Sequence, residues 1–154
     1  MTAISDIRAD FIEKVGQITQ RENMPRIAGR VLGLLIFDGK PVAFGDLAQE
    51  LQVSRGSISS SVRMLEDRGV IRRIGLPGER QDFFELAAPP FAGFLEGALR
   101  RIRQTRREIN ETLDALPDDA RGPQCRIKAY SDFYATIGMA LGHALEQDLA
   151  ADRV

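Results

Sequence analysis

The feature that most constrains the fold is a change in apolar period near the middle of the chain. Between residues 4 and 67, apolar residues recur every three or four positions, which is typical of helices that pack through one face. Residues 70–76 and 81–87 are instead rich in β-branched and aromatic residues, and Pro77-Gly78 between them favours a turn. From residue 89 the helical period returns. The sequence therefore predicts a mainly α-helical chain with one small β-hairpin.

Local signals mark where the helices before the hairpin begin and end. Pro25 suits the first turn of a helix that Asp38-Gly39 should end. A short helix follows at about residues 44–51. Its expected N-cap, Ala43, is a poor cap because alanine has no side-chain oxygen to accept a hydrogen bond from the first free N–H groups.

A better-capped helix comes next. Ser54 is a good N-cap for a helix from about Arg55 to Asp67, and Gly69 should end it. Three helices followed by a hairpin are the outline of a winged helix-turn-helix. The predicted fold class is therefore mainly α with a small β-hairpin wing, flanked by further helices.

The helix at 55–67 has an unusual outer face. On a helical wheel, Ile58, Val62 and Leu65 form one apolar face. The opposite face and its flanks are small, hydroxylic and basic, with Gly56, Ser57, Ser59, Ser60 and Arg63. Serine and glycine are poor helix formers, so helix stability does not explain them. A helix lying in the major groove of DNA would explain them, and an ordinary exposed helix with polar filler is the alternative.

Three segments resemble the MarR superfamily, and more specifically its GbsR branch. They read PRIAGRVLGLL at 25–35, DLAQELQVSRGSISSSVRMLEDRGVIRRI at 46–74 and LPGERQDFFEL at 76–86. Ala43 and Glu79 depart from the usual pattern, which has a hydroxyl cap and an aspartate at these places. The resemblance implies a transcriptional regulator, usually a dimer, with its second turn-motif helix in the major groove and its wing in the neighbouring minor groove.

Residue types and the resemblance together indicate the DNA contacts. Gly56 would let the helix N-terminus approach a phosphate, and Arg80 on the wing would enter a narrow minor groove. Arg73 has a second reading as a solvated strand charge. The full candidate set is Arg55, Gly56, Ser57, Ser59, Ser60, Arg63, Arg73 and Arg80.

The flanking helices carry more apolar surface than a small monomer needs. Residues 91–116 follow a near-heptad pattern, and apolar stripes also run along 127–149 and 4–18. Two copies related by a two-fold axis would read an inverted repeat, so we expect a homodimer, with packing inside one chain as the alternative. The expected division is an N-terminal dimerisation helix, a DNA-binding lobe and C-terminal dimerisation helices, at residues 1–21, 22–88 and 89–154.

The resemblance also implies a small-molecule effector that changes the spacing of the two recognition helices. GbsR-like members are associated with choline or glycine betaine metabolism, and a quaternary ammonium favours an aromatic cage. Core packing is the alternative role for the aromatic residues. The candidate ligand-binding residues are Phe11, Phe37, Tyr130 and Tyr134.

Other sequence features say less about function. The basic run at 100–108 should be a solvated face paired with carboxylates, with a secondary DNA contact as the alternative. Cys125 is interpreted as an incidental cysteine, with a redox sensor as the alternative. No His/Cys cluster or nucleophile–base pair is recognisable, so no metal, cofactor or enzymatic activity is expected.

Composition narrows the class further. Apolar residues make up 44% of the 154 residues, which indicates a folded chain. One cysteine excludes an intrachain disulfide and fits a reducing cytoplasm, and neither a signal peptide nor a membrane-spanning run is visible. The overall prediction is a cytoplasmic homodimer that binds a double-stranded DNA operator and acts as a repressor. A winged-helix protein–protein interaction module without DNA binding is the alternative.

Overall fold

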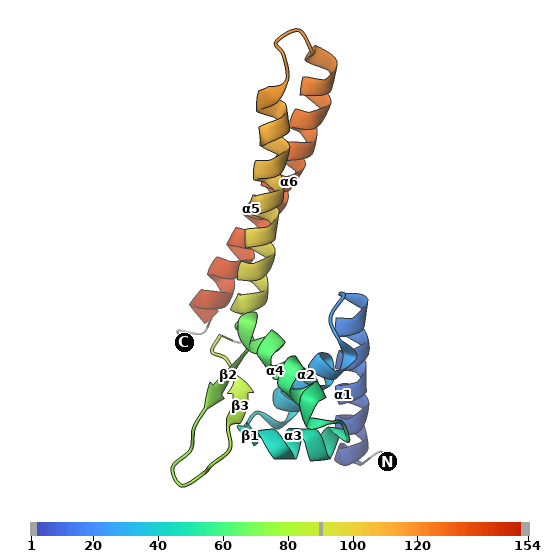
Figure 1. Cartoon of the computed structure of the whole chain (residues 1–154), viewed down its shortest axis with the longest axis vertical. Coiled ribbons are helices and arrows are strands. Elements are labelled where there is room, and N and C mark those ends of the chain that lie inside the picture. Colours follow the sequence, from blue (N-terminus) through green and yellow to red (C-terminus); the bar gives the residue numbers. More distant parts are fainter. Residues whose placement is uncertain (1–2, 90, 152–154) are drawn as a thin grey trace. The chain divides into compact units, whose positions relative to one another are not determined.

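The computed structural model describes residues 3–89 and 91–151. The chain divides into two compact units, Met1–Pro90 and Phe91–Val154 (Figure 1). The first unit contains α1 (Ile4–Arg21), α2 (Arg26–Asp38), β1 (Val42–Ala43), α3 (Phe44–Leu51), α4 (Arg55–Asp67), β2 (Ile71–Ile74) and β3 (Phe83–Leu86). The second contains α5 (Ala92–Ala115) and α6 (Arg121–Ala151). The predicted order of four helices, a hairpin and two helices is confirmed.

The core of the first unit is built around α2. This helix packs against α1 and α4, and its apolar residues Val31, Leu34 and Leu35 are at most 1% exposed. Ile58 and Leu65 of α4 are fully buried as well. Because α2 is apolar around much of its circumference, it takes the central position that its sequence predicts.

The predicted helix boundaries are confirmed. Gly39 follows α2 with a left-handed φ of +63°, which a residue without Cβ adopts at no steric cost. Ser54 Oγ accepts a hydrogen bond from the N–H of Ser57 at 3.1 Å and so caps α4. At Ala43 there is no side-chain cap, also as expected.

The sheet contains one strand more than predicted. Strands β2 and β3 form the expected antiparallel hairpin, with Arg73 opposite Phe84. In addition, β1 pairs with the other edge of β3, where Val42 is opposite Phe84, and the strand order is β1-β3-β2. The expectation of a lone hairpin was therefore incomplete. A strand of two residues has no periodicity to read, and only its tertiary partner reveals it.

The face through which α1 packs differs from its predicted apolar stripe. Its buried residues are Ile12, Val15, Gly16 and Thr19. Ile4 and Ile7, which belong to the predicted stripe, are 75% and 50% exposed. The buried face is displaced because small residues, Gly16 and Thr19, allow the two helix backbones to approach closely.

The second unit is an antiparallel pair of long helices (Figure 1). Few of their described residues are buried. Leu99 and Ser131 are buried between them, and the Ser131 hydroxyl donates to Asn110 Oδ1 at 2.6 Å. Several large apolar side chains face outward on this unit: Phe91, Tyr130, Phe133, Met139 and Leu149. Among the residues described, no helix is long and apolar enough to cross a bilayer.

The basic run on α5 forms an exposed face, as expected, but its expected pairing with carboxylates is not observed in the described part of the chain. Its arginines were predicted to pair with carboxylates, but none of them does so among residues 3–89 and 91–151. Arg106 instead donates to Ser131 Oγ at 3.4 Å, and Arg107 donates to Gln104. Glu108, which follows the run on the same helix, accepts a hydrogen bond from Gln104 at 2.7 Å.

Candidate nucleic-acid interface

The packing of α4 decides which of its residues face outward. Ile58, Val62 and Leu65 are at most 1% exposed, so the helix is anchored through one side. The opposite side, with Gly56, Ser60 and Arg63, is exposed. The division into a buried and an open face that the wheel predicted is therefore confirmed, although contact with DNA remains a prediction.

The hydroxyls of Ser57 and Ser60 on the outer face of α4 already have hydrogen-bond partners close by in the chain. Ser54 Oγ donates to Ser57 Oγ at 2.9 Å, and Ser60 Oγ donates to the carbonyl oxygen of Gly56 at 3.0 Å. Each hydroxyl oxygen keeps lone pairs that can accept, and the hydroxyl proton can rotate to another partner. The outer face of α4 therefore carries small polar groups that can change their hydrogen-bond partners, rather than charges throughout.

A hollow of about 350 Å³ lies between α4 and the wing. It brings together four of the candidate residues, Arg55, Ser59, Arg73 and Arg80, although they lie on three separate segments of the chain. Phe44 contributes part of the lining, and the Arg55 guanidinium lies 4.7 Å from the centroid of its ring. This stacking holds a positive charge at the start of the recognition helix.

Arg73 makes more contacts within the chain than the other candidates. Its Nη2 lies 2.9 Å from Glu66 Oε1, and its Nη1 lies 3.0 Å from Asp82 Oδ2. The hydrogen bond to Glu66 and the charges of both carboxylates raise the pKa of Arg73. Its guanidinium also lies 5.3 Å from the Phe84 ring centroid. Arg73 thus joins α4 to both strands of the wing.

Sequence reasoning missed the residues that join the wing to α3. Gln81 Oε1 accepts a hydrogen bond from the Gly45 N–H at 3.0 Å, and the Asp82 carbonyl accepts one from the Phe44 N–H at 2.9 Å. These are the first N–H groups of α3. The sequence did contain one signal for these contacts. Ala43 cannot cap α3, and the free N–H groups at the start of a helix need a partner.

The aromatic ligand candidates form two pairs. The rings of Phe11 and Phe37 lie 6.0 Å apart in the first unit, and those of Tyr130 and Tyr134 lie 5.1 Å apart in the second. The two tyrosine hydroxyls are 3.2 Å apart, and the hydrogen bond to Tyr130 raises the pKa of Tyr134.

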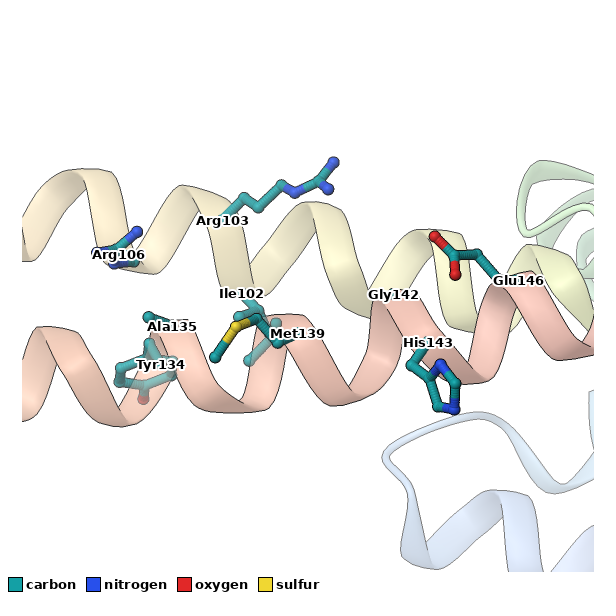
Figure 2. Close-up of a pocket in the computed structure, with 10 residues that line it drawn as sticks. Ile102, Arg103, Arg106, Tyr134, Ala135, Met139, Gly142, His143 and Glu146 are labelled. Atoms are coloured by element: carbon teal, nitrogen blue, oxygen red, sulfur yellow. The ribbon is translucent and has the colours of Figure 1, made fainter.

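Tyr134 also lines a groove of about 490 Å³ within the second unit. Figure 2 shows Arg103 and Arg106 on α5 and Tyr134, Met139 and His143 on α6. Arg103, Arg106 and the Glu146 carboxylate all line this groove, so it presents charged groups of both signs. In the part of the chain that the structure describes, no three His, Cys, Asp or Glu side chains could jointly hold a metal ion.

The architecture of the first unit is that of a winged helix, in which a turn motif of two helices is followed by a two-stranded wing. The sequence profile of the MarR family matches residues 22–81, which include the turn motif and most of the wing before its second strand.

Known transcriptional regulators are also similar to this chain. The HTH-type transcriptional regulator MmpR5 of Mycobacterium tuberculosis is 30% identical over 137 residues, which span 88% of this chain and 83% of the relative. The HTH-type transcriptional repressor OpcR of Bacillus subtilis is 26% identical over 85 residues, 55% of this chain and 46% of the relative. A crystal structure of a transcriptional regulator, 30% identical, matches with a TM-score of 0.75 over 91% of this chain and 96% of that one.

The chain belongs to the MarR family of winged-helix transcriptional regulators. It is therefore a transcriptional regulator with a DNA-binding winged helix, and the outward face of α4 with the adjoining wing is its candidate nucleic-acid interface.

Proposed function

We propose that the protein is a homodimeric repressor that binds an inverted repeat in double-stranded DNA. The observation that carries the proposal is the exposed face of α4, where Gly56, Ser60 and Arg63 lie on the helix that borders the hollow against the wing. Small residues let a helix lie deep in the major groove, where base edges offer donors and acceptors. The similarity to the repressor OpcR supports the sign of regulation.

The proposed contacts divide between the grooves. On α4, Arg55 and Arg63 would meet phosphates or guanine, and Ser57, Ser59 and Ser60 would accept or donate at base edges or phosphates. Gly56 would admit a phosphate at the helix N-terminus. Arg80 on the wing would enter the minor groove. Arg73 is bonded to Glu66 and Asp82, so its main part would be to place the wing, with a phosphate contact second.

The experiment that tests DNA recognition begins with selection of bound duplexes by the purified protein. Sequencing of these duplexes should give an inverted repeat, because two-fold symmetry of the protein is matched by symmetry of its site. Affinity for the selected duplex is then measured by fluorescence anisotropy across a salt series. Each neutralised phosphate contributes about −0.9 to the log–log slope, so a steep negative slope is expected.

A protein–protein interaction module without DNA binding is the competing function. It predicts no enriched duplex and a flat response to salt. The exposed arginines at the proposed groove-facing positions, Arg55, Arg63 and Arg80, favour DNA. Several like charges kept together on an open face suit a polyanionic partner.

Dimerisation is proposed from apolar surface that one chain leaves uncovered. On α1, Ile4 and Ile7 are 75% and 50% exposed, and on α6, Phe133 and Met139 are 56% and 69% exposed. Covering such side chains with a second copy is favourable by about 25 cal/mol for each Å² of apolar surface. In the proposed dimer, the two recognition helices lie one DNA turn apart, about 34 Å.

A small molecule is proposed to release the operator by favouring a dimer in which this spacing is wrong. Phe11 with Phe37, and Tyr130 with Tyr134, are the proposed contacts, because each pair offers ring faces and edges. Membership of the GbsR-like branch would suggest glycine betaine as the first compound to test. Glycine, which lacks the three methyl groups, is the matched control. Operator release by glycine betaine but not by glycine would support the assignment.

Regulation of transcription by binding is the proposed activity, with no catalytic step and no bound cofactor. As a DNA-binding regulator, the protein is proposed to work in the cytoplasm. Fractionation of cells that produce it, followed by immunoblotting, tests this location.

A further inference from the structure

We propose that Gln81 is a positioning residue that fixes the wing relative to the recognition helix by capping the N-terminus of α3. The inference rests on the proposed DNA contacts of Arg55 and Arg80. It adds a residue that touches no DNA but sets where both arginines lie. The juxtaposition of Gln81 with Gly45 is the observation from which this follows.

The N-terminus of α3 has no cap of its own. A helix begins with backbone N–H groups that lack partners within the helix, and side-chain oxygens normally satisfy them. The N-cap of α3 is Ala43, which makes no side-chain hydrogen bond. The wing supplies the missing acceptors, since Asp82 O accepts from Phe44 N–H and Gln81 Oε1 accepts from Gly45 N–H. The helix-turn-helix therefore depends on the wing for its cap.

The wing tip is held to the helices at one place. Residues 75–82 form the exposed loop between β2 and β3. Within that loop, the Glu79 N–H donates to the carbonyl oxygen of Leu76 at 3.1 Å. In the part of the chain that the structure describes, two hydrogen bonds join this loop to the helices, and the bond between Gln81 and Gly45 is the one that uses a side chain of the loop. Arg80 is its direct chain neighbour, so movement of Gln81 moves Arg80.

The same place also adjoins the recognition helix. A Cβ at Gly45 would lie 3.1 Å from Gln81 Oε1 and 3.6 Å from Arg55 Nη1. The Arg55 guanidinium is held over the ring of Phe44, the residue before Gly45. The start of α3 therefore contacts both the wing and the first residue of α4. Loss of the hydrogen bond between Gln81 and Gly45 should change the distance between Arg55 and Arg80 while leaving α4 folded.

The test uses the full chain with Gln81→Ala, Gln81→Glu and the double variant Ala43→Ser/Gln81→Ala. The hydroxyl introduced by Ala43→Ser would supply a local cap for α3, but it cannot hold the wing. We expect Gln81→Ala to expose the Gly45 amide to hydrogen exchange. We expect Gln81→Glu to keep its protection, because a carboxylate oxygen accepts the same bond and suits a helix N-terminus.

Measurements of DNA binding distinguish a residue that only caps α3 from one that also positions the wing. In Gln81→Ala, we expect operator affinity to fall about three- to tenfold, the effect of one lost hydrogen bond. Hydroxyl-radical protection should be lost in the minor groove under the wing, while major-groove protection by α4 stays. The double variant should recover thermal stability but not the minor-groove protection.

Two results would overturn the inference. One is full recovery of the minor-groove protection in the double variant, which would make Gln81 a cap and nothing more. The other is unchanged Gly45 exchange and unchanged footprint in Gln81→Ala. If the wild-type protein leaves no minor-groove footprint, the proposed wing contact itself is wrong, and the amide-exchange comparison still decides whether Gln81 tethers the wing.

Discussion

Arg8 Nη2 lies 2.7 Å from Asp38 Oδ2, and this ion pair joins the first helix to the end of the second. The same nitrogen lies 2.7 Å from Glu50 Oε2, so one guanidinium links α1, α2 and α3. The Asp38 side chain is only 15% exposed, and the hydrogen bond from Arg8 lowers its pKa. The N-terminal helix is thereby attached to the helices of the DNA-binding unit by charge as well as by apolar packing.

The Arg8–Asp38 pair predicts a dependence of stability on pH. Because folding lowers the pKa of Asp38 below its ordinary value of 3.8, the folded state favours the ionised carboxylate. This stabilisation is fully present above that value and is lost as the pH falls through the lower folded pKa. Arg8→Ala should cost about 1–2 kcal/mol at pH 7, and the cost should shrink towards pH 3. Urea unfolding at both pH values, at one protein concentration, measures the difference.

Lys14→Ala is the matched control for Arg8. Lys14 Nζ lies 2.6 Å from Asp10 Oδ2 on the same helix, but both side chains are more than 60% exposed. Exposed pairs contribute little, so this variant should unfold almost as the parent does. An equal loss in both variants would show that α1 is stabilised by its general charge and not by the Arg8–Asp38 contact.

The crossing of α1 and α2 predicts strong sensitivity at Gly29. A Cβ at this position would lie 1.9 Å from Thr19 Oγ1 and 2.7 Å from the Val15 carbonyl oxygen. Gly29→Ala should therefore force the two helices apart and cost about 1–3 kcal/mol, although alanine favours the helix. Thermal unfolding followed by circular dichroism checks the prediction. A rise in melting temperature would mean that the helices do not cross so closely.

Gly56 should show the opposite behaviour. An added Cβ there would have Ser54 Oγ as its nearest neighbour, at 3.9 Å, so alanine fits without strain. Gly56→Ala should stabilise the fold by about 0.4–1 kcal/mol and yet weaken operator binding, because the added methyl keeps the helix N-terminus from the phosphate. Parallel melting and anisotropy measurements test both parts. Unchanged affinity would remove Gly56 from the proposed interface.

Arg63→Ala separates binding from folding in another way. Arg63 is exposed on α4, so its removal should leave the melting temperature unchanged. Operator affinity should fall, and if the contact is to a phosphate, the log–log salt slope should become shallower by about 0.9. A marked loss of stability would show instead that Arg63 supports the fold.

Leu141→Glu tests the proposed dimer. Leu141 is half-buried on α6, on the helix that also exposes Met139. A carboxylate placed in an apolar interface is costly to desolvate, so the variant should appear as a monomer in light scattering. Gln147→Glu adds the same charge at an exposed position of α6 and should leave the mass unchanged. A dimeric Leu141→Glu protein would place the contact elsewhere.

Short-range patterns were sufficient for the helices, for the hairpin and for the outward face of α4. Ser54 and Gly39 act through their own backbone neighbours, and the spacing of Ile58, Val62 and Leu65 acts through helix geometry. These signals lie within a few residues of the structure they specify, so reading along the chain recovers them. The α1 stripe is covered only in part within the chain, with Val15 buried and Ile4, Ile7 and Ile18 exposed, because three- and four-residue spacing does not say which face the neighbouring helix will cover.

What the sequence by itself determined was therefore the order of helices and wing, the ends of those helices, and the candidate residues Arg55, Ser60, Arg63 and Arg80 on α4 and the wing. Only the tertiary structure decided that β1 joins the sheet, that Arg73 is held by Glu66 and Asp82, and that Gln81 replaces the cap missing at Ala43. The physical reason is that an unpaired N–H or guanidinium can be satisfied by any suitable acceptor in reach. Which acceptors come close enough depends on how segments that are distant in the sequence pack together, and no local pattern contains that information.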